Sequence, residues 1–168
     1  MDATQLKNLQ APLKEKYKAE PQAAIITLKA QGKISDGISC SVETGQAIVK
    51  AGLHPATGGT GLLACSGNLL LEALVACAGV TLRAVATAIG VHIQDGSSVM
   101  AEGDLDFKGT LGVSKDVPVG FKNIRLTFYL DTDATAEQID SLKKLTERYC
   151  VVYRTLVNGI NIETQYNA

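Results

Sequence analysis

The spacing of hydrophobic positions divides the first third of the chain into a helix followed by strands. Leucines recur at helical intervals within residues 2–19, which predicts a peripheral helix that is interrupted or kinked at Pro12. Between residues 23 and 51, two strand-like runs predict two or three strands in meander order, with the sequence ETGQ as a turn. We therefore predict a helical extension over residues 1–20 and a single domain over residues 21–168.

A glycine-rich loop leads into the most hydrophobic segment of the chain. Residues 53–67 have the small-residue composition of a long loop, and long loops in compact domains tend to be functional or disordered. Residues 69–89 are apolar nearly all round, which predicts a helix of about six turns that is covered on most sides. Asn68 is its expected N-cap, and Gly90 is its expected stop.

The last part of the chain returns to alternation and then to a helical period. Residues 98–109 and 121–131 alternate between apolar and polar side chains, which predicts half-buried antiparallel strands. Thr135 and Gln138 form a capping box. It opens a helix whose predicted apolar stripe is Ile139, Leu142, Leu145 and Tyr149. A short helix over residues 151–157, closed by the sequence NG, and a final strand over residues 160–165 complete an α+β order.

Composition and charge exclude several classes of partner. The chain of 168 residues has a formal net charge of −1, few aromatic side chains and no tryptophan, so neither nucleic acid nor an acidic membrane surface is an expected partner. The N-terminus lacks the pattern of a signal peptide, and Glu72 and Arg83 interrupt the apolar segment, which argues against a membrane span. We expect a cytoplasmic protein.

The cysteines are the candidate chemical groups. The chain has Cys40, Cys65, Cys77 and Cys150 but no CxxC motif, and its two histidines are far from any ligand-like cluster, so no metal site is predicted. Cys77 lies within the central helix, and Cys150 lies at a helix junction near two arginines. Backbone amides at a helix start and nearby arginines both stabilise a thiolate. From the residues alone, the two thiols fit either core packing or a redox pair.

Three segments resemble a known family. The run SGNLLLEALVACAGVTLRAVA (residues 66–86) resembles the central helix of the OsmC-like superfamily, which includes osmotically inducible protein C and the organic hydroperoxide resistance proteins. ERYCVVYRTL (residues 147–156) is similar to that family's second-cysteine segment, in which proline usually follows the cysteine. HPATGGTG (residues 54–61) resembles the family's approach to the helix. The resemblance covers most of the chain from about residue 23 onward.

The resemblance implies both a fold and an activity. The fold is a two-layer α+β arrangement with antiparallel sheets and a central buried helix, intertwined with a second copy as a homodimer whose active sites lie at the subunit interface. The peroxidase members reduce organic hydroperoxides with a cysteine pair and without metal or haem, and dithiols such as lipoylated proteins restore them. Carried over to this sequence, Cys77 would be the peroxidatic cysteine and Cys150 the resolving one, with no bound cofactor.

Two residues that activate the thiolate in the peroxidase members are missing from this sequence. No arginine precedes Arg83, so the loop before the central helix lacks the expected cation. The position expected for a glutamate carries Gly67 or Asn68, and Glu72 lies too close to Cys77 to be the same residue. Without these groups, the Cys77 thiol should have a higher pKa and form less thiolate at neutral pH.

The remaining candidates leave two functions open. His54 is a candidate polar partner of Cys77, or else an exposed loop residue. Cys65 is a candidate alternative resolving thiol, or else a small residue in a crowded loop. The retained cysteine pair favours a peroxidase. The missing arginine and glutamate favour a dimeric binding protein that holds a small hydrophobic ligand at the subunit interface, with the thiols as pocket lining or redox sensors.

Overall fold

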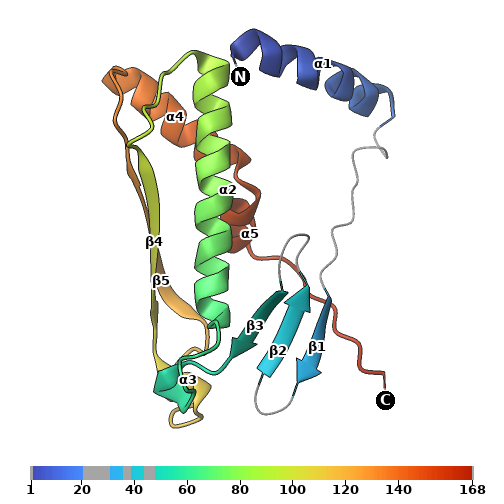
Figure 1. The fold of residues 1–168 in the computed structure, drawn as a ribbon, viewed down its shortest axis with the longest axis vertical. Helices are drawn as coiled ribbons and strands as arrows, with labels where there is room; N and C mark the ends of the chain where they lie inside the picture. Colours follow the sequence, from blue (N-terminus) through green and yellow to red (C-terminus); the bar gives the residue numbers. More distant parts are fainter. Residues whose placement is uncertain (1, 21–30, 36–38, 44–47, 168) are drawn as a thin grey trace. The chain divides into compact units, whose positions relative to one another are not determined.

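The computed structural model describes residues 2–20, 31–35, 39–43 and 48–167. The chain is α+β, as the sequence predicts, and its elements follow one another in the order shown in Figure 1: α1 (Ala3–Ala19), β1 (Gln31–Ser35), β2 (Ser39–Glu43), β3 (Ile48–Gly52), the short 3₁₀ turn η2 (Pro55–Thr57), α2 (Ser66–Ile89), β4 (Ser98–Leu105), α3 (Phe107–Thr110), β5 (Phe121–Tyr129), α4 (Ala136–Tyr149) and α5 (Val151–Asn158).

The chain forms two compact units, which are described separately. The first unit contains the chain up to Lys7, Ala73–Met100 and Thr127–Ala168, and the second contains Asn8–Glu72 and Ala101–Leu126. The division at residue 20 stays a prediction. The N-terminal helix is confirmed as α1, which contains Pro12. Its start is capped reciprocally, because Asp2 and Gln5 each accept a hydrogen bond from the other's backbone N–H.

The predicted meander is an antiparallel sheet in the order β1-β2-β3. Residues 23–30 and most of the predicted ETGQ turn lie outside the described residues. The loop that follows β3 is tied back to it, because Ala64 accepts a hydrogen bond from the N–H of Gly52 and donates one to the carbonyl of Lys50, both at 3.0 Å. This tie fixes where the chain enters α2.

The central helix begins earlier than predicted. α2 starts at Ser66, and the N–H of Leu69 donates to the carbonyl of Cys65 at 3.1 Å. Asn68 therefore lies inside the first turn, and its assignment as the N-cap is wrong. The backbone tie at Ala64 holds the preceding chain in place, so the helix starts immediately after it.

The helix stop is confirmed at Gly90, which has φ of 74°. The N–H of Val91 donates to the carbonyl of Ala86 at 2.9 Å, and the N–H of Gly90 donates to the carbonyl of Thr87 at 3.4 Å. This pair of bonds is the Schellman pattern, which needs a residue in the left-handed region directly after the helix.

One face of α2 supplies the core of the first unit. Its buried residues are Leu74, Ala78, Leu82, Val85 and Ala86. The last three pack with Val91, Ile93 and Leu142. The helix is apolar on its other faces too, and the side chain of Val80 is 72% exposed. By length and composition alone α2 could cross a membrane. The core helix of a globular protein meets the same two criteria, so they do not decide between the two.

The capping box of α4 is confirmed by hydrogen bonds between Thr135 and Gln138 in both directions. The predicted stripe is wrong at Tyr149, which is 57% exposed, whereas Thr146 is buried. Tyr149 is the last residue of α4, where the stripe meets the helix end, and the guanidinium of Arg148 lies 5.4 Å from its ring centroid.

The alternating segments are confirmed as the paired strands β4 and β5. Phe107, predicted to extend the first of them, instead begins α3, because Asp106 caps that short helix by accepting a hydrogen bond from the N–H of Lys108. α5 is confirmed and ends at Gly159. The predicted strand over residues 160–165 is wrong. These residues are exposed and pair with no strand in the described part of the chain.

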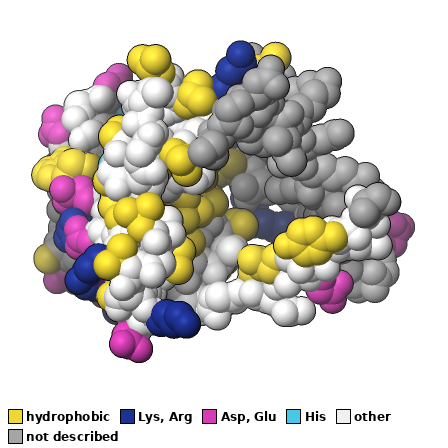
Figure 2. Space-filling model, turned by 90° about the horizontal axis from the view of Figure 1, so that it is seen from below, with side chains coloured by type: hydrophobic (Ala, Val, Ile, Leu, Met, Phe, Trp, Pro, Cys, Tyr) yellow, Lys and Arg dark blue, Asp and Glu magenta, His cyan; other side chains and the backbone are white. Residues whose placement is uncertain are grey.

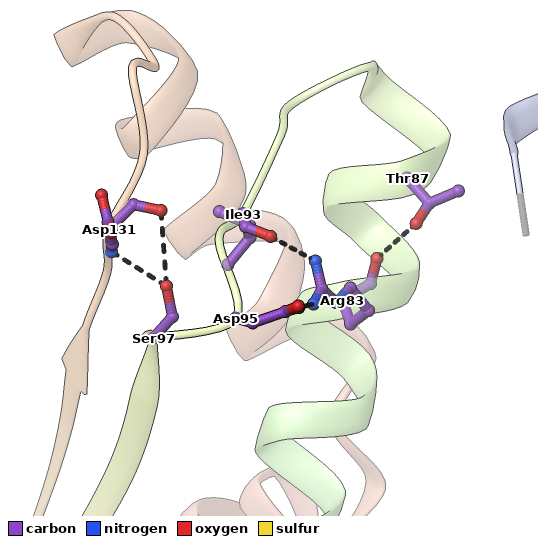
Figure 3. Close-up of polar contacts among 6 residues, drawn as sticks. All are labelled: Arg83, Thr87, Ile93, Asp95, Ser97 and Asp131. Carbon is purple, nitrogen blue, oxygen red and sulfur yellow. Dashed lines mark hydrogen bonds and ion pairs between the residues drawn. The ribbon is translucent and has the colours of Figure 1, made fainter.

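Arg83 fixes the connection between α2 and β4 (Figure 3). Its guanidinium donates to the carbonyl of Ile93 at 2.5 Å and reaches the carboxylate of Asp95 at 3.4 Å. Farther along the same connection, the hydroxyl of Ser97 accepts a hydrogen bond from the N–H of Asp131 at 2.9 Å. These bonds hold the loop against the end of α2 and the segment that follows β5.

The left-handed backbone at Gly90 predicts a specific stability effect. A Cβ added at Gly90 or at Gly120 would meet no atom within 4 Å, but only Gly90 of the two has a positive φ. We expect Gly90→Ala to lower the free energy of unfolding by about 1 kcal/mol, whereas Gly120→Ala should leave it unchanged or raise it by up to about 1 kcal/mol. Urea unfolding measures both values. Equal effects of the two substitutions would show that backbone conformation at Gly90 does not limit stability.

Candidate active site: a pair of thiols

The two cysteines singled out in the sequence lie in the first unit. Cys77 projects from the middle of α2 and is partly exposed, whereas Cys150 is 1% exposed. Cys150 is the single residue between α4 and α5 (Figure 1), and the start of α5 lies next to Cys77 of α2. Both cysteines are free thiols. The structure thus places one reachable and one buried thiol where helices meet.

The backbone at Cys150 determines what α5 presents to Cys77. Cys150 has φ of −72° and ψ of 110°, so the chain leaves the helical conformation for this one residue. Its N–H donates to the carbonyl of Thr146 and its carbonyl accepts from the N–H of Arg154, each at 2.9 Å. It makes no side-chain cap for α5. The first N–H groups of α5 therefore need acceptors from elsewhere.

The sulfur of Cys77 is such an acceptor. Burial raises the pKa of the Cys77 thiol, but hydrogen bonds from the backbone of Val152, the thiol of Cys150, the backbone of Val151 and the hydroxyl of Thr81 outweigh it. The pKa of Cys77 is therefore lowered from its ordinary value. Thr81 lies one helical turn after Cys77, which places both side chains on the same face of α2.

The pKa of the Cys150 thiol is shifted in the opposite direction, above its ordinary value. Burial raises its pKa, and the neighbouring Cys77 raises it further, against lowering contributions from the backbone of Tyr153 and the hydroxyl of Thr81. The sequence led us to expect that a helix start and two arginines would favour a thiolate at Cys150. That expectation is wrong, because the first amides of α5 act on Cys77 and because burial dominates at Cys150.

No arginine takes part in the thiol pair's hydrogen bonds among the described residues. Arg83 bonds to the loop after α2, and Arg148 lies over Tyr149. Gly67 belongs to the second unit, where a Cβ on it would meet Phe121 at 3.4 Å and the sulfur of Cys65 at 3.6 Å. The groups that lower the pKa of Cys77 are two backbone amides, a hydroxyl and a thiol.

His54 and Cys65 line a cavity that does not include Cys77 or Cys150. This cavity of about 350 Å³ lies in the second unit and is also lined by Phe107 and Phe121. The Nδ1 atom of His54 accepts a hydrogen bond from the N–H of Ala56 at 3.0 Å, and its ring stacks on Phe107 with centroids 4.9 Å apart. His54 thus caps η2. Neither His54 nor Cys65 is among the groups that hydrogen-bond Cys77.

Comparison with known proteins now places the chain in a family. The family model for OsmC-like proteins matches residues 59–165, which include both cysteines. The chain belongs to the OsmC-like family. No curated protein matches it. Among the described residues, no group of three or more His, Cys, Asp or Glu side chains could hold a metal ion.

Solved structures of the OsmC-like fold superpose on most of the chain. An OsmC-like protein of Mycoplasma pneumoniae is 16% identical with a TM-score of 0.66, over 80% of this chain and 89% of that one. An organic hydroperoxide resistance protein of Legionella pneumophila is 20% identical with a TM-score of 0.60, over 79% and 90%. The hydroperoxide resistance protein OhrB of Bacillus subtilis is 21% identical with a TM-score of 0.52, over 81% and 93%. At these identities the likeness shows the fold.

Sequence reasoning missed Thr81, Val151 and Val152 as parts of the site. The spacing of four residues between Cys77 and Thr81 was visible in the sequence, because residues at this interval share a helix face. The two valines gave no side-chain signal, since their contribution is the backbone N–H that nearly every residue carries.

The opposed pKa shifts predict which thiol reacts first. During brief exposure to iodoacetamide at pH 7, we expect Cys77 to be alkylated well before Cys150, because Cys77 forms thiolate more readily and is more exposed. Mass spectrometry of tryptic peptides resolves the two, since Cys150 lies in a short peptide of its own. Faster labelling of Cys150 would contradict this arrangement.

Proposed function

We propose that this OsmC-like protein is a thiol peroxidase that reduces organic hydroperoxides. The Cys77 thiolate attacks the peroxide, the O–O bond breaks, and the alkoxide released takes a proton to become an alcohol. Cys77 is left as a sulfenic acid. The sulfur of Cys150 then attacks the sulfenic sulfur, which forms a disulfide and releases water. A dithiol, such as a lipoylated protein, restores both thiols by two exchange steps and is itself oxidised to a disulfide.

The hydrogen bond between the two thiols carries this proposal. Cys150 donates to Cys77, so the resolving sulfur already lies beside the sulfur it must attack. The proximity of Cys77 raises the pKa of Cys150 while Cys77 is a thiolate. Oxidation of Cys77 to a neutral sulfenic acid removes that charge and makes Cys150 easier to deprotonate for the second step. This ordering favours a peroxidase over a binding protein whose thiols only line a pocket.

The catalytic test separates these two functions. With cumene or tert-butyl hydroperoxide and dihydrolipoamide as the dithiol, we expect turnover by the wild type and a loss of at least 100-fold in Cys77→Ser, as nucleophile removal usually costs. Cys150→Ser should instead stop at a sulfenic acid on Cys77 that dimedone traps. Cys65→Ser is the matched control and should keep its turnover. Wild-type protein without turnover would contradict the peroxidase proposal.

We also propose that the protein works as an intertwined homodimer in a reducing, cytoplasmic environment. The support is the apolar surface that a single chain leaves exposed. Figure 2 shows hydrophobic side chains between the charged ones on one face of the molecule. Val80 on α2 is 72% exposed. Apolar faces of this kind are commonly covered by a second subunit.

The dimer has a direct test. Sedimentation equilibrium should give twice the mass of the 17.7 kDa chain, and a charge at the exposed apolar position in Val80→Asp should shift the protein toward the monomer. Lys143→Gln makes the same change in net charge at an exposed position of α4, without placing a charge on the apolar surface, and serves as the control. A monomeric wild type would overturn the dimer and leave the thiol chemistry untouched.

A further inference from the structure

The N-terminus of α5 has an unusual arrangement of donors and acceptors. Ser, Thr, Asp or Asn normally caps a helix and accepts one of its first N–H groups. Here Cys150 occupies that position without a side-chain cap, and its own N–H is already bonded to Thr146. α5 nonetheless starts directly after the buried Cys150, and an N–H group left without a partner at a buried position is costly.

The sulfur of Cys77 accepts from these groups across the interface between α5 and α2. The N–H groups of Val151 and Val152 converge on it from α5, and the hydroxyl of Thr81 adds a third donor from α2. Backbone N–H groups at a helix start carry a partial positive charge and favour an anion. The sulfur of Cys77 takes the place of the missing cap, and it accepts these hydrogen bonds better as a thiolate than as a thiol.

We propose that Val151 and Val152, through their backbone N–H groups, and Thr81, through its hydroxyl, are positioning residues that hold Cys77 as a thiolate in place of an arginine. This inference rests on the proposed role of Cys77 as the reacting thiol. At positions 151 and 152 it assigns the activating function to backbone atoms, so it does not depend on the chemistry of those two side chains. The other titratable group at the site is Cys150. The nearest cations in sequence, Arg148 and Arg154, are exposed and do not act on Cys77.

Proline at position 151 tests the inference by deleting one N–H. Proline is favoured at the first position of a helix, where its N–H is not needed for the helix itself. The preceding residue, Cys150, already has ψ of 110°, close to the extended conformation that proline requires before it. Val151 is 69% exposed, so its side chain can be replaced without disturbing the core. Val151→Ala keeps the N–H and is the matched control.

The readout is the pH profile of alkylation at Cys77. In a Cys65→Ser background, the tryptic peptide that ends at Arg83 carries a single thiol, so mass spectrometry follows Cys77 alone. At pH 7 we expect Val151→Pro to react about tenfold more slowly than Val151→Ala, because a hydrogen bond to a charged group is lost, with an inflection displaced to higher pH. At high pH, where every thiol is ionised, the two variants should converge.

A second pair of variants tests the hydroxyl. Thr81→Val should displace the inflection to higher pH, and Thr81→Ser should restore it. Thr146→Val is the control, since the buried hydroxyl of Thr146 has no hydrogen-bond partner among the described residues. Identical profiles for Val151→Pro and Val151→Ala, with circular dichroism showing both folded, would overturn the inference. Because the assay uses no hydroperoxide, it distinguishes this failure from failure of the peroxidase proposal.

Discussion

At Cys150 the chain leaves α4, adopts one extended residue and enters α5, and the chemistry of the site depends on this break. A continuous helix through this position would consume the N–H groups of Val151 and Val152 in its own i→i−4 bonds. The break releases them toward α2, where the sulfur of Cys77 lies. The same residue also supplies the second thiol. One backbone irregularity therefore positions both the donors that favour the thiolate and the sulfur that can later attack it.

The packing of α5 on α2 has two opposing effects on the pKa of Cys77. Covering α2 with α5 removes water from the thiol and raises its pKa, yet the covering element brings its own donors. Because Cys77 keeps some exposure, the desolvation is incomplete and the hydrogen bonds prevail. Cys150 has one backbone amide and one hydroxyl in its favour, is fully buried, and faces a neighbouring thiolate, so desolvation prevails there. The pKa values of the two thiols shift in opposite directions because Cys150 is more fully buried than Cys77, more than because of the residues next to each cysteine in the sequence.

Local signals in the sequence predicted much of the fold. The capping box at Thr135, the stop at Gly90 and the alternation in β4 and β5 are each fixed by neighbours within a few residues, and the structure confirms them. The start of α2 and the final strand failed because tertiary hydrogen bonds, or their absence along the described chain, decided them. The two thiols were identifiable as a pair, but the acceptor of the α5 amides was not. Which sulfur those amides reach depends on how α5 packs against α2. The spacing of residues along the chain does not predict this packing.

The backbone donors at Cys77 also explain how the chain can depart from the side-chain pattern of the OsmC-like peroxidases. No arginine precedes Arg83, and the position expected for the glutamate carries Gly67 or Asn68, which by side-chain comparison alone leaves Cys77 without its usual activators. The segment around Cys150 departs too, since Val151 stands where proline usually follows the cysteine, and a proline there would carry no N–H. A helix of eight residues is marginal in isolation, so α5 persists through packing, and its amides act by direct contact rather than at long range. Activation of Cys77 is then a property of the packed fold, which is why side-chain motifs alone understate it.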